Sequence, residues 1–198
     1  MTEKEKMIAG KVYNCFDEEL STALRKAKQL CHKYNDIFFE DEAAAKKIID
    51  ELLQAEHNDG YCVFTPSFWC DYGFNIKVGK NFYSNHNLVI LDCAEVRFGD
   101  NVFIGPNCGF YTAIHPIDAG QRKMEIEWAK PIKVGNDVWF GGSVTVLPGV
   151  TIGDNVVIGA GSVVVKDIPS GVVAVGNPCK PIRKITEADK LNLNDPNV

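Results

Sequence analysis

Apolar residues recur every sixth position through most of the second half of the chain, in pairs whose two members are separated by one residue. In two blocks, 17 of 18 such positions are apolar if cysteine is counted, whereas the 45% hydrophobic composition would give about eight. A period of six with paired apolar positions is typical of short β-strands that turn one side inward and meet at tight corners. The pairs are 96/98, 102/104, 108/110, 132/134, 138/140, 144/146, 150/152, 156/158 and 162/164.

Three such strands form one triangular coil, and stacked coils bury a continuous core. The repeat therefore predicts a mainly β fold, a left-handed parallel β-helix over residues 58–185. An earlier block, with the pairs 76/78, 82/84 and 88/90, has the same period shifted by two, which predicts a bulge or a longer corner between Ile90 and Val96. Glycine follows many pairs, and we expect it to provide the unusual φ angles of the corners. These glycines are Gly79, Gly99, Gly105, Gly135, Gly141, Gly153 and Gly159.

Residues 1–57 have instead the three- and four-residue spacing of amphipathic helices. One apolar stripe runs through residues 21–35, where Ser21 or Asp17 could cap the start, and a second stripe runs through residues 41–56. We interpret residues 1–57 as a helical appendage to the β-helix, and residues 186–198 as a C-terminal tail.

The repeat is interrupted between Phe110 and Ile132, so we expect an emitted loop at about residues 111–131. A long loop in a regular solenoid is more often functional than accidental. This loop carries His115, and the proline that follows it biases His115 towards an extended backbone. A neutral imidazole held there could take a proton from an alcohol near neutral pH. We interpret the other histidines as surface or satisfied core residues: His32, His57 and His86.

The formal net charge of −5 argues against a nucleic-acid-binding protein that relies on positive charge. No apolar run reaches the ~18 residues of a membrane span, and the charged N-terminus has no secretory signal. We therefore expect a soluble, cytoplasmic protein without nucleic-acid or membrane partners. The seven cysteines are odd in number and lack CxxC spacing, which favours free thiols.

More specific motifs lie along nearly the whole chain. They are EKEKMIAGK at 3–11, DYGFNIKVGKNFYSNHN at 71–87, LD at 91–92, AIHPID at 113–118, KPIKVGNDVWFGG at 130–142, PGVTIGDNVVIGAGSVVVKDIP at 148–169 and GNPCKPIRKI at 176–185. With these motifs the chain resembles the maltose and galactoside O-acetyltransferase group of the hexapeptide-repeat acyltransferases. The resemblance includes the N-terminal helices, which distinguish this group from other β-helix acyltransferases.

The resemblance implies acetyl transfer from acetyl-CoA to a hydroxyl of a maltose-, glucose- or galactoside-like sugar, with neither a covalent enzyme intermediate nor a metal. His115 matches the family's general base, and Gly142 matches the position whose backbone N–H stabilises the oxyanion. Asn85 matches an asparagine that contacts the acceptor near the base. The resemblance further implies a homotrimer with active sites between subunits, to which His115 and the CoA groove come from neighbours.

The resemblance also assigns residues to each substrate. Carboxylates suit sugar hydroxyls because they accept directional hydrogen bonds, although Asp71 and Asp92 could instead be corner residues and Tyr83 rim packing. Glu127 could either orient His115 or bind the acceptor. The implied acceptor contacts are Asp71, Tyr83, Asn85, Asp92 and Glu127. The implied CoA contacts are Trp139, Gly142, Ala160, Val165, Lys166, Lys180 and Arg183, of which the cations are placed to meet phosphates.

Three alternatives stay open beside a sugar O-acetyltransferase. An enzyme of the same fold could act on an amine, such as a xenobiotic or an amino sugar, and a non-catalytic scaffold would use the β-helix for assembly alone. A zinc enzyme resembling γ-carbonic anhydrase needs three histidine ligands, and only His86 and His115 lie in the repeat. The galactoside enzymes carry acidic residues where this chain has Cys15 and Cys93, and the loss of both argues against a galactoside as the acceptor.

Overall fold

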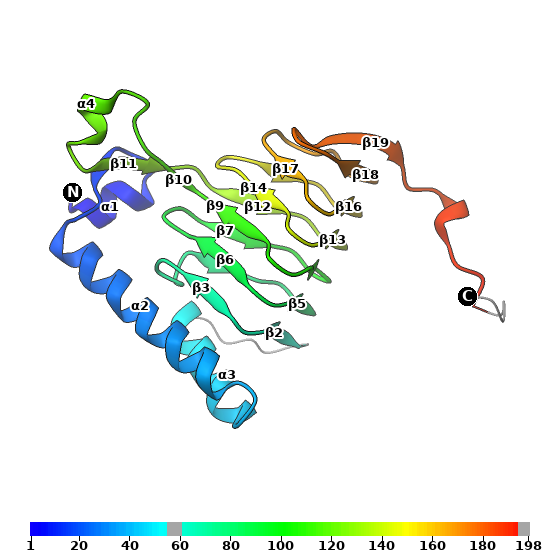
Figure 1. The fold of residues 1–198 in the computed structure, drawn as a ribbon, viewed down its shortest axis with the longest axis horizontal. Coiled ribbons are helices and arrows are strands. Elements are labelled where there is room, and N and C mark those ends of the chain that lie inside the picture. Colours follow the sequence, from blue (N-terminus) through cyan, green and yellow to red (C-terminus); the bar gives the residue numbers. More distant parts are fainter. Residues whose placement is uncertain (55–60, 194–198) are drawn as a thin grey trace.

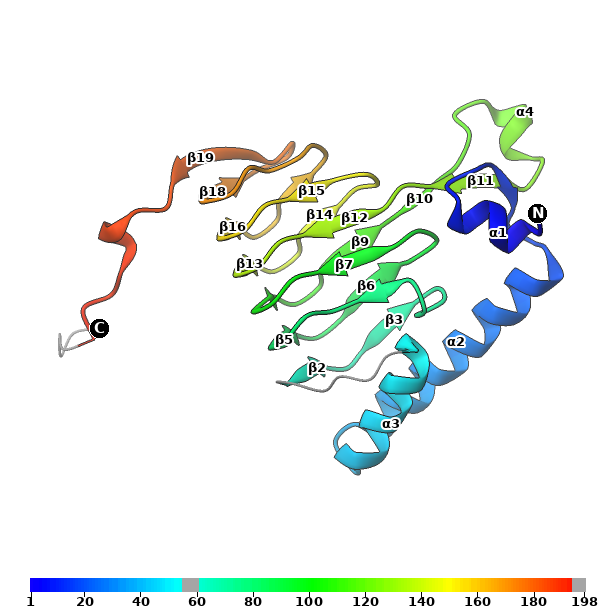
Figure 2. The ribbon, with the colours of Figure 1, turned by 180° about the vertical axis from the view of Figure 1, so that it is seen from behind.

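Short strands wind into a three-sided prism, in which each full coil contributes one strand to each of three faces (Figures 1 and 2). The computed structural model describes residues 1–54 and 61–193. The predicted left-handed parallel β-helix, with N-terminal helices and an emitted segment, is confirmed. The first face contains β2 (Cys62–Phe64), β5 (Phe82–Ser84), β8 (Phe103–Ile104), β13 (Val138–Phe140), β16 (Val156–Ile158), β18 (Val172–Val175) and β19 (Lys180–Lys184). The second face contains β3 (Phe68–Cys70), β6 (Leu88–Leu91), β9 (Gly109–Tyr111), β14 (Thr145–Val146) and β17 (Val163–Val164). The third face contains β4 (Ile76–Lys77), β7 (Val96–Phe98), β12 (Ile132–Val134) and β15 (Thr151–Ile152).

The pairing register shows the length of each coil. Early strand partners lie twenty residues apart, as in Val89 beside Gly109, and later partners lie eighteen apart, as in Val138 beside Val156. Eighteen is three times the period of six, and the early coils are longer because the corner after the second face has extra residues. This includes the predicted longer corner before Val96, which the structure places at residues 92–95.

Positive φ angles at the corners belong mainly to asparagine and aspartate, so the role expected for the repeated glycines is wrong. Asn101 has a φ of 56°, and its side-chain amide donates to the Asp137 carboxylate of the next coil at 2.8 Å. Asparagine tolerates this left-handed conformation better than most residues do. Glycine is needed for a different reason, because a Cβ on Gly99 would lie only 2.7 Å from the carbonyl carbon of Gly135 in the next coil.

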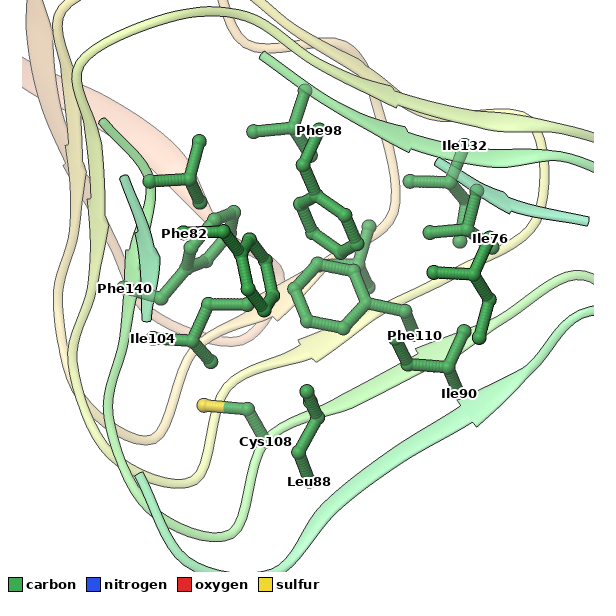
Figure 3. Packing of buried hydrophobic residues seen from close by; sticks show 14 of the residues in the cluster. Ile76, Phe82, Leu88, Ile90, Phe98, Ile104, Cys108, Phe110, Ile132 and Phe140 are labelled. Atoms are coloured by element: carbon green, nitrogen blue, oxygen red, sulfur yellow. The ribbon is translucent and has the colours of Figure 1, made fainter. Parts of the chain in front are cut away.

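All eighteen repeat positions are buried, including the polar Ser162, whose hydroxyl is hydrogen-bonded to the backbone. Phenylalanine rings follow one another along the prism axis, with centroids 5.2 Å apart for Phe82 and Phe98 and 5.0 Å apart for Phe98 and Phe110. Figure 3 shows these rings turned towards one another, with aliphatic side chains around them. Tilted and edge-to-face rings at these separations attract each other beyond their contribution to burial.

Three helices precede the β-helix, namely α1 (Glu3–Ile8), α2 (Glu18–Ile37) and α3 (Glu42–Leu53). Asp17 caps α2 by accepting the backbone N–H of Glu19 at 3.0 Å, whereas α1, which begins in a capping box formed by Thr2 and Glu5, was not predicted. Apart from Leu20, the buried residues of α2 and α3 belong to one cluster with those of the coils, so the helices close one end of the prism. The end of the predicted second helix and His57 lie outside the described residues.

The segment that interrupts the repeat is a β-hairpin. Its strands β10 (Ala113–Ile114) and β11 (Ile126–Ala129) pair antiparallel, and the short helix α4 (Ala119–Arg122) lies between them. β1 (Tyr13–Asn14), which lies between α1 and α2, pairs with the other edge of β11. A three-stranded antiparallel sheet therefore joins the N-terminal segment to the hairpin, and Figure 1 shows α1 beside β11.

The chain leaves the prism along the first face, where β19 pairs antiparallel with β18. A 3-10 turn at Glu187–Asp189 follows. Within residues 1–54 and 61–193, no helix has the length and apolarity needed to span a membrane.

Candidate active site

Two corners of the prism hold most of the predicted site residues. We call the corner between the first and second faces the first corner; it comprises residues 65–67, 85–87, 105–108, 141–144 and 159–162. The corner between the second and third faces is the second corner; it comprises residues 71–75, 92–95, 112–131, 147–150 and 165–167.

His115 directly follows β10 at the second corner and faces Glu127 of β11. The Nε2 atom of His115 lies 3.4 Å from Oε2 of Glu127. The His115 side chain is 54% exposed, whereas the Glu127 side chain is only 8% exposed. A fixed carboxylate orients an imidazole and stabilises its protonated form, so this pair is arranged to take a proton from a molecule bound at the corner.

A third residue, Tyr13 of β1, contacts the carboxylate of this pair, and no pattern in the sequence predicts it. Its hydroxyl donates to Oε1 of Glu127, and the residue is 1% exposed. Burial, with the neighbouring Cys93 and Glu127, raises the pKa of Tyr13, so the hydroxyl stays protonated and remains a donor. The pairing of Tyr13 with Glu127 joins distant parts of the chain outside the repeat, and no periodic signal in the sequence reports it.

Asp71 lies at the second corner and is already ion-paired. Its Oδ1 atom is 3.0 Å from Nζ of Lys28 in α2, and its Oδ2 atom is 3.7 Å from the thiol of Cys93. Burial, followed by the nearby Glu127 and Asp71, raises the pKa of Cys93, which keeps it a neutral thiol. Lys28 thus ties the helical segment to the second corner, and the acceptor contact of Asp71 stays a prediction.

Asp92 is fully buried at the same corner, where it supports the backbone. Its Oδ1 atom accepts the backbone N–H groups of Asp71 at 3.0 Å and Tyr72 at 2.8 Å. Burial raises its pKa to about 6, and Oδ2 has no hydrogen-bond partner among the described residues. These contacts favour the alternative in which Asp92 is a structural residue of the corner. The residue is 0% exposed in this chain, so an acceptor has no surface of Asp92 to contact.

Tyr83 and Asn85 lie instead on the first face and at the first corner, together with Trp139. They line one side of a shallow groove of about 460 Å³. The indole of Trp139 stands outward, and the residue is 56% exposed although it lies in the repeat. The groove is lined by Tyr83, Asn85, Phe103, Ile104, Gly105 and Trp139.

Backbone N–H groups at the first corner are available to a ligand. The amides of Gly141 and Gly159 donate to the next coil, but the amides of Gly142 and Ala160 make no hydrogen bond within the described part of the chain. Unpaired N–H groups at an open corner can hold a carbonyl or a developing oxyanion.

The remaining residues predicted to contact CoA are divided between two places. Val165 and Lys166 lie at the second corner, whereas Lys180 and Arg183 lie on β19 at the end of the first face. The guanidinium of Arg183 is paired with Asp189 at 2.7 Å, a contact that raises the pKa of Arg183. Lys166 and Lys180 form no ion pair with other described residues.

The structure therefore divides the predicted site between two corners of one chain. The hairpin with His115 lies on the opposite side of the prism from β5 and β13, as Figures 1 and 2 both show. Residues 1–54 and 61–193 contain no group of three or more His, Cys, Asp or Glu side chains arranged to hold a metal ion.

Comparisons with known proteins agree with this architecture. Residues 6–56 match the maltose acetyltransferase hexapeptide capping motif, and residues 131–166 match the bacterial transferase hexapeptide of six repeats. A Saccharomyces cerevisiae protein named an acetyltransferase is 50% identical over 191 residues, which cover 96% of both chains. The crystal structure of a maltose O-acetyltransferase from Clostridium difficile 630 is 46% identical with a TM-score of 0.89, over 94% of this chain and 99% of that one. A galactoside acetyltransferase in complex with coenzyme A is 39% identical with a TM-score of 0.89, over 99% of this chain and 97% of that one.

Proposed function

The chain belongs to the maltose and galactoside O-acetyltransferase group of the hexapeptide-repeat acetyltransferases, and on this basis we propose that it transfers the acetyl group of acetyl-CoA to a hydroxyl of a sugar. The sequence resemblance and the assignment as an acyltransferase are confirmed. The sugar acceptor, the general base and the assembly belong to the proposal.

The pair of His115 and Glu127 carries this proposal. His115 takes the proton of the acceptor hydroxyl, and the oxygen attacks the carbonyl carbon of the thioester. The N–H of Gly142 stabilises the oxyanion that forms. The C–S bond then breaks, and His115 returns its proton to the leaving thiolate, so that the acetylated sugar and free CoA are the products. Glu127 stabilises His115 while it holds the proton.

The division of the site between two corners supports an assembly in which copies of the chain meet. If the second corner of one copy faces the first corner of its neighbour, His115 of one chain approaches Asn85 and the free N–H groups of the other. A closed ring of three copies of a three-sided prism satisfies every such contact. The pantetheine would then run beside Trp139, Gly142 and Ala160 of one copy and Val165 and Lys166 of the next, with Lys180 and Arg183 near the phosphates.

A thiol-release assay with acetyl-CoA tests the reaction. The wild type is assayed against sugars, amines and serine, beside His115→Ala. We expect release that depends on a sugar and that falls by ~10²-fold or more in the variant. Release with amines alone would transfer the assignment to an N-acetyltransferase, and undiminished activity of His115→Ala would refute the general base.

Co-expression of His115→Ala with Asn85→Ala tests the assembly. If each site takes His115 from one copy and Asn85 from the next, one site in each mixed trimer contains both wild-type residues, which is about a quarter of all sites after random assembly, and these sites regain activity. Mixed oligomers without activity, formed from variants that fold and assemble normally, would place both residues in a site within one chain.

A further inference from the structure

The N-terminal strand β1 places a buried tyrosine behind the proposed general base. Tyr13 pairs in register with Glu127, and its hydroxyl donates to Oε1 of that residue. The other oxygen, Oε2, lies 3.4 Å from Nε2 of His115. The two oxygens of one buried carboxylate thus have two different partners, one from residues 1–57 and one from the hairpin.

We propose that Tyr13 is a positioning residue, which holds Glu127 so that Oε2 accepts the Nε2–H of His115 and leaves Nδ1 as the atom that takes the acceptor proton. This inference rests on the proposed function and adds to it an explanation of which ring nitrogen of His115 carries the proton. A neutral imidazole carries its proton on one nitrogen only, so a carboxylate fixed at Nε2 keeps Nδ1 free of a proton.

Burial makes the tyrosine necessary. A carboxylate withdrawn from water must have hydrogen-bond donors, or it becomes neutral or turns towards solvent. Tyr13 gives one donor to Glu127, and in the proposed arrangement the Nε2–H of His115, whose nitrogen lies 3.4 Å from Oε2, gives the other. Without the phenol, Oε1 loses its donor, and Glu127 is then a weaker and less well-oriented partner for His115.

The Cys93 thiol also interacts with the phenol of Tyr13, and burial raises the pKa of both groups, so both stay protonated. Cys15, which lies next to β1, donates its thiol to the backbone carbonyl of Glu125 at 3.2 Å, and the Cys93 thiol lies 3.7 Å from Asp71. Neither thiol donates to Glu127 in the structure. The proton path is then fixed: the acceptor O–H breaks, Nδ1 gains the proton, and Glu127 stabilises the resulting imidazolium through Nε2–H.

Tyr13→Phe tests this role, since it removes only the hydroxyl. We expect kcat to fall by about 10- to 100-fold, the range typical for loss of a residue that orients a reacting group. We expect the KM for acetyl-CoA to stay the same. The matched control is Tyr34→Phe, which removes a buried hydroxyl that donates to the carbonyl of Phe64 at 2.8 Å, far from His115 in the sequence and outside the hairpin sheet. The control should lose thermal stability and keep its kcat, whereas equal kcat for Tyr13→Phe and wild type would overturn the proposal.

A double-mutant cycle separates positioning from general damage. In a Glu127→Gln background, Tyr13→Phe should lower kcat by less than about two-fold, because the interaction it supports is already lost. If Tyr13→Phe lowered kcat by the same factor in the Glu127→Gln background as in the wild type, the two residues would act independently and the proposal would be overturned.

The tautomer can be measured in the wild type without any variant. In NMR spectra of protein labelled with ¹⁵N-histidine, we expect the neutral His115 ring to have a protonated Nε2 and an unprotonated Nδ1. The opposite tautomer would overturn the proposal, and this test remains available if Tyr13→Phe does not fold. An active His115→Ala variant would instead refute His115 as the general base, the part of the proposed function on which this inference rests. Loss of activity in His115→Ala with full activity in Tyr13→Phe would refute only the role of Tyr13.

Discussion

Replacing Asp92 by asparagine should stabilise the protein at neutral pH, because it removes a buried negative charge and keeps the shape of the side chain. Oδ1 accepts two backbone N–H groups, and an amide oxygen can accept the same two. Oδ2 has no partner among the described residues, so substituting nitrogen there breaks no hydrogen bond. An unpaired buried amide is less unfavourable than an unpaired buried charge.

The pKa of Asp92 fixes the sign and the size of this effect. Burial is the main cause that raises it from 3.8 to about 6, Asp71 contributes in the same direction, and the N–H of Tyr72 opposes it. Since the folded protein holds this proton more tightly than the unfolded chain, Asp92 contributes stability below pH 3.8 that is lost as the pH rises through about 6. A shift of about two pKa units corresponds to about 3 kcal/mol. Asparagine does not titrate, so the stability of Asp92→Asn relative to the wild type should rise by about 3 kcal/mol between pH ~4 and ~7 and then level off.

Equilibrium unfolding in urea at several pH values measures this difference. Both proteins are compared at the same chain concentration, because assembly adds to apparent stability. Contributions of titrating groups that do not interact with Asp92 cancel in the difference, and the unpaired amide adds a constant that does not depend on pH. The quantity compared is the free energy of unfolding of Asp92→Asn minus that of the wild type. If it stayed constant from pH 4 to 8, or fell as the pH rises, ionisation of the buried Asp92 would not destabilise the folded protein, and the reasoning would be refuted.

Two further substitutions test the packing of the coils by the same urea titration. Gly99→Ala places a Cβ 2.5 Å from Oδ1 of Asn136 and should destabilise the fold by about 1–3 kcal/mol, and an unchanged midpoint would show that the coils are not as closely stacked as described. Phe110→Ala empties a site between Phe98 and Phe140, whose ring centroids lie 5.0 and 5.2 Å from it, and should cost about 3–5 kcal/mol, whereas a loss below about 1 kcal/mol would contradict a continuous ring stack.

The repeat could be predicted from the sequence because each strand obeys the same local rule. A side chain such as Phe140 or Val146 points inward because of its place in the period, and its neighbours in the next coil follow from adding eighteen. The role of Gly99 could not be predicted in this way. Its need for space depends on Gly135 in the next coil, and the φ angle of the corner is carried by Asn101 instead.

The three-stranded sheet of β1, β10 and β11 could not be predicted from the sequence. β11 pairs with β10 on one edge and with β1 on the other, so Glu127 lies opposite Tyr13, which precedes it by more than a hundred residues. Neither strand belongs to the repeat, and two residues in β1 are too few to show a period. The resemblance assigned Glu127 and His115 separately, but only the structure shows that one carboxylate joins His115 to the N-terminal segment.

On the faces of a regular solenoid, side chains point either into the core or into solvent. A face therefore does not place a buried carboxylate next to a solvent-exposed imidazole. The interruption of the repeat after β9 provides this arrangement. The hairpin carries His115 away from the prism surface, and β1 covers the back of Glu127, so a carboxylate that would be hydrated on a face of the prism is instead buried and fixed. An imidazole with such support on one side and solvent on the other can exchange protons with a bound molecule without losing its orientation. On this argument the N-terminal segment that contains β1 is part of the catalytic unit, because a protein that lacked it would lose the donor that holds Glu127 in place.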